Sequence, residues 1–497
     1  MMAEFQIPQL LAVSGLSLFV VGLGIGAPSF PFSLLSAPQF VGAGGRAKLT
    51  EAGPMILEPL SEFYGRRPIY LMSFSCFSLL MVPCALAPNI GVLLAFRFLS
   101  GIAGSASLSV SSGTIGDLFA GSDLGAPMMI CAASFARTSL TPRPPTLLPN
   151  LFPVGLRITA NGRRLQFVGP SLGPLVGGFI NQNANWRWTF WATLAWAVVE
   201  LAVLWLSVPE TYEPVLLRLR AERRRAERLA TGDTRDVAAL ERPEAAPHPI
   251  PRMVARACQR PFQLLVLDPM VLLLCVSTAI VMGLLYLSFQ VLPLMFGHVH
   301  GFDLQTSGLT FLGLLVGAMA GALSDPLWRR LHGHLAARRA APRAEAEPEP
   351  EPDYEPELRL PPGVVGGVLV PIGLFVFAWS AQPHVHWLVP IAGTVLSGAG
   401  MLLVFSAVLT FLVEAYPLGA ASALAANCFM RNSFAAGFPL FWAALYRALG
   451  DRMAGYVLVC LALPIAPLLA AFVVWGKRLR ARSRFAGGSH PHAHIGG

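Results

Sequence analysis

Several ionisable side chains stand inside long apolar runs, where a charge is unfavourable unless it is paired or faces water. The candidates among them are Arg97, Glu414 and Arg431; for Glu200, packing or snorkelling is at least as good an interpretation. A charged group in such a run is a candidate for binding a proton or a charged solute. Each also has a simpler interpretation: Arg97 can snorkel to a membrane surface, Glu414 can lie at an interface, and Arg431 can pair with an acid.

A second set of charges stands at the ends of apolar runs, around a polar hairpin at residues 58–68. Gly65 permits a tight turn there, and Pro68 fits the first turn of the helix that follows. Adjacent arginines at the edge of an apolar run place this turn in the cytosol by the positive-inside rule. The candidate residues at this surface are Glu62, Gly65, Arg66, Arg67 and Asp117.

A third candidate is the glycine-rich string at residues 169–178. Glycines on one helix face let two helices approach closely, and prolines kink a helix. Such a tight contact would seal one end of a cavity, although plain helix packing explains the same pattern. The residues that carry it are Gly169, Gly173, Pro174, Gly177 and Gly178.

The composition defines the elements that must position these residues. The chain has 497 residues, of which 54% are hydrophobic and 13% charged, whereas soluble proteins have roughly 25% charged residues. Several runs exceed the ~20 apolar residues that cross a bilayer, and they lack strand alternation. The sequence therefore predicts an all-α, polytopic membrane protein.

Several other classes of function find no support in the sequence. The net charge of +9 comes from arginines at the ends of apolar runs, so it predicts membrane topology and not a nucleic-acid partner. The seven cysteines include no CxxC pair and no His/Cys metal spacing. No nucleophile–base pair or phosphate-binding loop indicates an enzyme, and we expect neither metal nor cofactor.

The apolar runs predict two helical halves joined by a charged linker. The N-terminal half covers residues 1–208, the cytosolic linker 209–263 and the C-terminal half 264–480, with a disordered tail at 481–497. A Glu-Pro repeat predicts a disordered cytosolic loop at 328–362. The predicted spans are Leu10–Ile25, Ile69–Ala87, Ile90–Phe119, the joined fragments 123–134 and 167–180, Trp186–Val208, Leu264–Phe289, Gly308–Leu323, Val364–Ser380, Trp387–Val413, Ala420–Leu445 and Ala454–Trp475.

Two segments without a helical pattern interrupt the N-terminal half, at 28–53 and 135–166. The second separates apolar fragments of about 12 and about 14 residues, each shorter than the ~20 that a span needs. Its prolines and arginines cannot face lipid. We therefore expect both segments to be aberrant inserts, such as translated introns.

Several strings resemble one family of membrane proteins. Residues 58–68 resemble the loop motif between the second and third spans of the major facilitator superfamily, except that Glu58 stands where a small residue is usual. Residues 97–101 look like its fourth-span arginine motif, and 169–178 resemble its fifth-span antiporter motif. Residues 209–217 are similar to the string that leads into the central loop. The chain thus resembles the fungal drug:proton antiporters with twelve spans.

This resemblance implies a fold of two six-helix halves, here with about eleven spans because no counterpart of the family's first span is found. It also implies secondary transport: proton-coupled export of a cationic or amphipathic small molecule, such as a polyamine or a drug. We expect the protein to act as a monomer, with its substrate, protons and the bilayer as partners. We expect the plasma membrane rather than the vacuolar membrane.

The resemblance also implies roles for single residues. Arg97 would face the cavity and couple proton binding to substrate movement. Glu62, Arg66 and Asp117 would belong to a cytosolic network that latches the two halves while the cavity faces outward. Glu414 would serve a cationic substrate or a proton.

Two alternatives remain open. The chain can be a non-transporting sensor on a transporter scaffold, although such sensors often carry a long structured tail and this tail is short and basic. It can also be an inactive product of a defective gene model. An efflux assay in vesicles that depends on a proton gradient separates transport from both.

Overall fold

The structure is a computed structural model in which every regular element is a helix among the residues that it describes. These residues are 2–5, 9–26, 65–105, 168–207, 210, 215, 259, 261–344, 356–416 and 420–483. The predicted all-α class is therefore confirmed. Both expected inserts and most of the linker lie outside the described residues.

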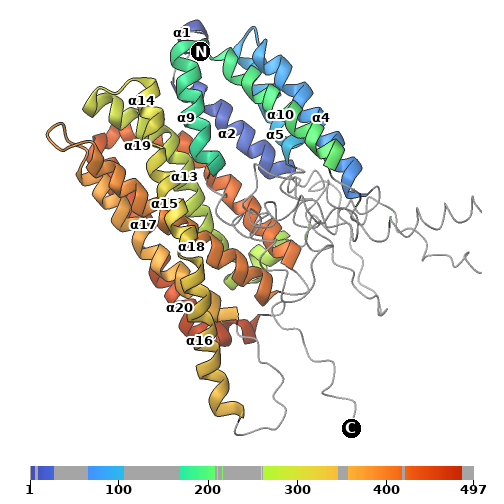
Figure 1. Ribbon diagram of the computed structural model, residues 1–497, viewed down its shortest axis with the longest axis vertical. Coiled ribbons are helices and arrows are strands. Elements are labelled where there is room, and N and C mark those ends of the chain that lie inside the picture. The colour runs from blue at the N-terminus through green and yellow to red at the C-terminus, as the bar shows by residue number, and fades with distance from the viewer. Residues whose placement is uncertain are drawn as a thin grey trace, which may run out of the picture.

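The N-terminal helices form one group, in which α4, α5 and α10 lie side by side and α2 packs against α5 (Figure 1). Met81, Cys84, Leu93 and Phe190 form a small buried core among α4, α5 and α10. The elements of this group are α1 (Met2–Phe5), α2 (Gln9–Gly26), α4 (Arg66–Ala85), α5 (Ile90–Gly104), α9 (Val168–Asn183) and α10 (Arg187–Ser207).

The C-terminal helices form a larger group with one continuous apolar core. Small residues let α17 and α18 approach closely: a Cβ on Gly400 would lie 2.7 Å from the carbonyl oxygen of Gly366. The elements are α13 (Pro269–His300), α14 (Leu304–Leu309), α15 (Leu312–Leu323), α16 (Asp325–Ala344), η3 (Pro356–Arg359), α17 (Pro361–Trp379), α18 (Leu388–Ala415), α19 (Ala420–Ala462) and α20 (Ile465–Arg482).

Among the described helices, the two helix groups meet in two main regions. α2 packs along α19, where Val20 is buried against Ala435 and Ala436. α9 packs on α14 and α15. Each contact joins a helix of the N-terminal group to helices of the C-terminal group. Together they form the boundary between the two groups.

The helices have the length and composition of membrane spans. Each predicted span overlaps a helix, although residues 106–119 and the fragment 123–134 lie outside the described residues. α19 bends at Gly450 (φ 74°), between the last two predicted spans. Within the described part of the chain, seven stretches of helix are long and apolar enough to cross a bilayer: Arg66–Ala85, Arg187–Leu206, Pro269–His300, Leu304–Leu335, Pro356–Trp379, Leu388–Ala415 and Met453–Arg480.

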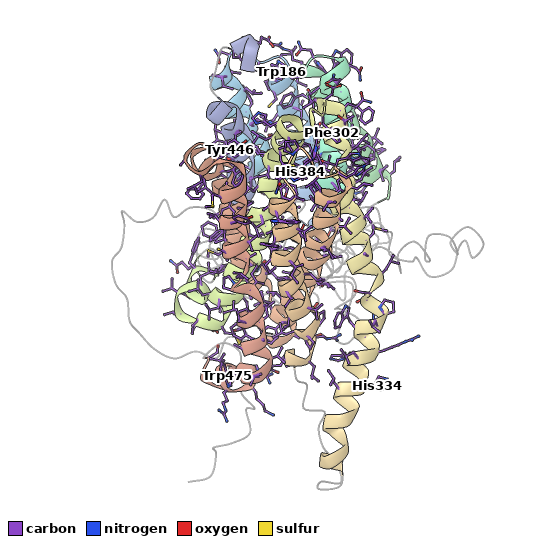
Figure 2. All side chains as sticks on the ribbon, turned by 90° about the vertical axis from the view of Figure 1, so that its left-hand side faces the viewer. Trp186, Phe302, His334, His384, Tyr446 and Trp475 are labelled. Carbon is purple, nitrogen blue, oxygen red and sulfur yellow. The ribbon has the colours of Figure 1, made fainter. Side chains whose placement is uncertain are left out.

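The connections alternate between two ends of the molecule. Figure 2 shows Trp186, Phe302, His384 and Tyr446 toward one end, and His334 and Trp475 at the other. The first four residues flank the arginine-poor connections, and the last two adjoin the arginine-rich ones. The positive-inside rule predicts that the second end is cytosolic, and we refer to it below as the cytosolic end.

The cytosolic loop expected to be disordered at 328–362 is ordered at both of its ends. α16 continues to Ala344 and extends beyond the other helices at the cytosolic end (Figure 1). η3 then precedes α17, and its Glu357 and Arg359 are ion-paired to other helices. The composition predicted disorder because it carries no information on these distant partners. The expected tail is helical up to Arg482, and the residues after Ser483 lie outside the described part.

Candidate functional site

Arg97 lies between aromatic rings from two neighbouring helices. Its guanidinium carbon is 4.6 Å from the ring centroid of Phe190 on α10 and 5.6 Å from that of Phe19 on α2. Such contacts stabilise a cation in a poorly hydrated site. No carboxylate among the described residues forms an ion pair with it. The arginine is therefore held by π-systems, and sequence reasoning gave neither phenylalanine a role.

Gly65, the first described residue of this segment, has a backbone conformation that favours glycine, with φ 96° and ψ 158°. α4 begins at the next residue, as Pro68 and Gly65 led us to expect. Glu62 and Asp117, the acids of the predicted latch, lie outside the described residues. The latch therefore stays a prediction.

Glu210 supplies the acid at this hairpin. Its carboxylate accepts hydrogen bonds from the backbone amides of Arg66 at 2.9 Å and Arg67 at 3.1 Å. Two arginines at a helix N-terminus oppose the helix dipole, and a carboxylate there offsets that effect. The Arg67 side chain also donates to the carbonyl oxygen of Trp205 at 2.9 Å. The sequence showed Glu210 only as part of the string after α10, without a partner.

The antiporter motif forms a close helix contact through one of its glycines. A Cβ on Gly178 would lie 2.9 Å from the carbonyl oxygen of Leu304, and one on Gly308 would lie 3.1 Å from that of Pro174. The α9 and α14 backbones therefore touch at these positions. By contrast, a Cβ on Gly173 would meet nothing within 4 Å, and one on Gly177 would meet Asn181 alone, at 3.9 Å.

Gly169 lies in the first turn of α9, before the contact with α14. The motif is thus divided: Gly178 and Pro174 participate in the contact between the two helix groups, whereas Gly173 does not. Gly308, the partner on α14, had no distinguishing pattern in the sequence. Only the fold reveals that it faces the motif.

Glu414 forms an ion pair with Arg359 of η3, with Oε1 and Nε 3.1 Å apart. Its side chain is 13% exposed and lies in the last turn of α18, at the cytosolic end. A neighbouring pair joins Glu357 of η3 to Arg480 of α20 at 3.2 Å. These pairs attach η3 to two helices, so the structure favours the interface role of Glu414 over a role in a cavity.

Arg431 is buried in α19 with 8% of its surface exposed. Its guanidinium carbon lies 5.0 Å from the ring centroid of Phe405 on α18. Its Nη2 donates to the Cys428 sulfur at 3.6 Å, and its Nε has no hydrogen-bond partner. No acid of the described chain pairs with it, in contrast to the simpler interpretation of the sequence.

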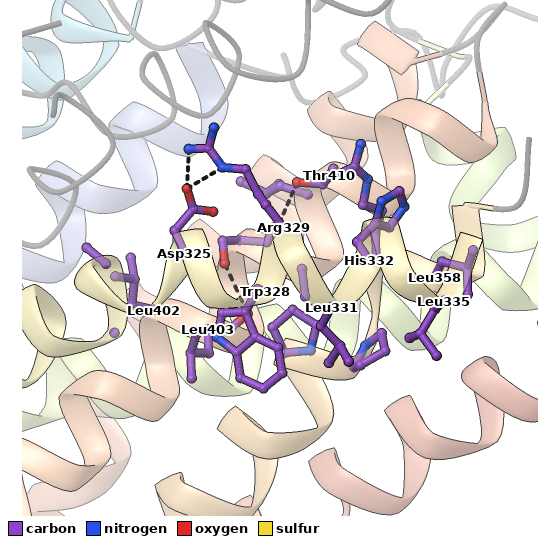
Figure 3. A pocket seen from close by; sticks show the side chains of 18 residues that line it. Asp325, Trp328, Arg329, Leu331, His332, Leu335, Leu358, Leu402, Leu403 and Thr410 are labelled. Atoms are coloured by element: carbon purple, nitrogen blue, oxygen red, sulfur yellow. Dashed lines mark hydrogen bonds and ion pairs between the residues drawn. The ribbon is translucent and has the colours of Figure 1, made fainter. Parts of the chain in front are cut away.

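A cavity of about 90 Å³ lies at the cytosolic end between α16, η3, α17 and α18 (Figure 3). Trp328 and Leu331 line one side, and the ion pair between Asp325 and Arg329 lies at its edge. The Trp328 indole donates to the Ser324 hydroxyl at 2.9 Å. None of the candidate residues from the sequence lines this cavity, so it is separate from the predicted site.

The described residues contain no group of three or more His, Cys, Asp or Glu side chains that could hold a metal ion. They do contain two arginines on aromatic rings, one close glycine contact between α9 and α14, and a carboxylate cap at the start of α4.

Comparison with known proteins decides the family. The family model described as Major Facilitator Superfamily matches residues 52–141 and 128–439. The chain belongs to the major facilitator superfamily. The fold agrees: the xylose transporter XylE from E. coli, in a partially occluded inward-open conformation, aligns with a TM-score of 0.51 and 14% identity, covering 93% of this chain and 86% of that one.

Two fungal members of the superfamily are similar over most of their length. The chain is 45% identical to "Efflux pump atB" of Aspergillus terreus over 434 residues, which is 87% of this chain and 82% of the relative. It is 30% identical to "Probable drug/proton antiporter YHK8" of Saccharomyces cerevisiae over 485 residues, or 97% and 80% of the two chains. This superfamily member is therefore a multi-pass membrane transporter.

Proposed function

We propose that this chain exports an amphipathic small molecule across the plasma membrane in exchange for protons, acting as a monomer. The observation that carries the proposal is Arg97, a membrane arginine held between Phe19 and Phe190 without an ion-pair partner in the described residues. A cation in this setting responds to the protonation and charge of the molecules around it. The relatives described as an efflux pump and a drug/proton antiporter support the direction and the coupling ion.

The contact between α9 and α14 supports a two-state transporter. Gly178 and Gly308 leave no room for side chains between the backbones, so this contact is either closed or broken. A dry contact of this kind prevents protons and water from leaking through a closed end. The expected cationic substrate, such as a polyamine, stays a prediction. Glu414, the acid expected to serve it, forms an ion pair with Arg359.

The test is transport into inside-out vesicles with an imposed proton gradient. Wild-type protein should accumulate a fluorescent amphipathic substrate only while the gradient exists, and a proton carrier should abolish accumulation. Arg97→Ala should insert normally and lose gradient-driven transport, whereas Arg97→Lys should keep part of it because the charge remains. Arg330→Gln, at an exposed arginine of α16, is the control.

Full transport by a well-inserted Arg97→Ala protein would refute the coupling role. Wild-type vesicles that move no substrate under any gradient would favour the sensor or the inactive product.

A further inference from the structure

Arg431 lies deep in the C-terminal helix group, and no acid among the described residues pairs with it. It lies about 16 Å along α19 from Ala420, at a rise of about 1.5 Å per residue. The helix continues beyond it to the bend at Gly450. Phe405 of α18, which stacks on it, lies roughly 15 Å from the cytosolic end of its own helix by the same rise. The guanidinium is therefore far from both ends of these helices.

The hydrogen-bonding capacity of Arg431 is largely unused in the described structure. A guanidinium has five N–H donors, and the single hydrogen bond found goes to the Cys428 sulfur, a weak acceptor. Its Nε is buried without a partner. An arginine in a protein cannot lose its charge to relieve this situation. Among the described residues, the site therefore lacks a negatively charged hydrogen-bond acceptor for the guanidinium.

The neighbours of Arg431 extend this polar site toward α13. Asn427, one helical turn earlier, is fully buried and donates to the Thr278 hydroxyl at 2.6 Å, but its Oδ1 has no partner. Tyr286 of α13 interacts electrostatically with Arg431. Cys428 of α19 and Tyr286 of α13 are thus polar neighbours of the cation, and the Phe405 ring provides an apolar wall.

The site adjoins the boundary between the two helix groups. Tyr286 packs against the cluster of Val20, Ala435 and Ala436, where α2 meets α19. Phe19, which contacts Arg97, packs against the same cluster. Both membrane arginines therefore border one contact between the helix groups, each through an aromatic neighbour.

We propose that Arg431 binds an anionic group of the exported molecule, so that the substrate class is amphipathic organic acids. The inference rests on the proposed transport function and names its substrate. A carboxylate matches the planar fork of a guanidinium and can accept two of its hydrogen bonds. The rings of Phe405 and Tyr286 suit the apolar body of such a molecule. A polycation would instead meet the unpaired charge of Arg431.

The test compares three probes of equal size: a naphthalene carboxylate, its methyl ester and a trimethylammonium naphthalene. Transport of each is measured in inside-out vesicles with a proton gradient. The wild type should prefer the carboxylate over both other probes. Arg431→Gln should lose this preference by roughly tenfold or more, because a site built for a polar group discriminates at least this strongly. Arg431→Lys should keep part of the preference.

The control is Arg330→Gln, which makes the same chemical change at an exposed arginine and should leave the preference intact. Equal wild-type transport of carboxylate and trimethylammonium, or an unchanged preference in Arg431→Gln, would overturn the inference while the transport function stands.

If the wild type transports none of the three probes, this result overturns the transport function itself. Binding to the purified protein then decides the inference. A rise of Tm with the naphthalene carboxylate, present in the wild type and absent in Arg431→Gln, supports it. No rise in the wild type overturns it.

Discussion

The carboxylate of Glu210 occupies the space into which a side chain at position 65 would project. The two residues are far apart in the sequence and meet at the start of α4, where Glu210 accepts the first amides of the helix. Glycine at position 65 therefore serves two purposes: it adopts a positive φ and leaves room for the capping carboxylate.

Gly65→Ala should destabilise the protein. A non-glycine residue at this φ and ψ is disfavoured by about 1–3 kcal/mol, and its Cβ would also displace the Glu210 carboxylate. Glu210→Gln should remove part of the cap, with a loss of about 1 kcal/mol. The measurement is Tm in detergent. Gly333→Ala, where a Cβ on α16 meets nothing within 4 Å, should leave Tm unchanged or raise it. Equal Tm values for Gly65→Ala and the wild type would contradict the assigned strain.

Gly178→Ala should weaken transport, because its methyl group would force α9 away from the Leu304 carbonyl oxygen. Overpacking of this kind is typically unfavourable by about 1–3 kcal/mol. Gly173→Ala is the matched control within the same motif, since nothing lies within 4 Å of its Cβ. The measurement is the rate of gradient-driven transport per inserted molecule. If both variants transport equally, the contact between α9 and α14 is not part of the cycle.

The pair between Glu414 and Arg359 should contribute to stability and not to substrate choice. A double-mutant cycle with Glu414→Gln and Arg359→Gln should give a coupling free energy of about 1 kcal/mol, as for a partly exposed pair. The ratio of transport rates for cationic and neutral probes should be unchanged in both variants. A selective loss of cation transport in Glu414→Gln would restore the cavity role expected from the sequence.

Glu4 should give the protein a pH-dependent contribution to stability. The hydrogen bond from the Trp186 indole, followed by that from Arg187, lowers the pKa of this carboxyl from its ordinary value of 4.5. Since the folded pKa is the lower one, the contribution is present above the unfolded value and disappears as the pH falls through the folded value. The Tm difference between the wild type and Glu4→Gln should therefore be largest near pH 7.

The same difference in Tm should shrink below about pH 4.5, the ordinary carboxyl value. Arg187→Gln removes one of the two partners and should reduce the pH dependence. A Tm difference that stays constant from pH 7 to pH 3 would show that the contact between Glu4 and Trp186 does not form.

The sequence by itself determined the fold class, the approximate span positions and the family. Long apolar runs must become helices in a bilayer, because lipid offers no partner for backbone amides. Local chemistry also identified Gly65 as a turn, since a glycine before a proline-containing first turn needs no distant information. The sequence also located Arg97 and Arg431, because a charge within an apolar run can be recognised without information on distant contacts.

The tertiary structure decided which residues meet. Glu210 caps α4, Gly308 faces Gly178 in the contact between α9 and α14, and Arg359 forms an ion pair with Glu414. Each pair joins separate elements. The periodicity of one helix cannot show which face of another it will contact. The expected disorder around η3 failed for this reason, because its partners Glu414 and Arg480 come from later helices. Only the packed chain shows that Arg431 has a ring beside it and no acid among the described residues, because burial and partners depend on three helices at once.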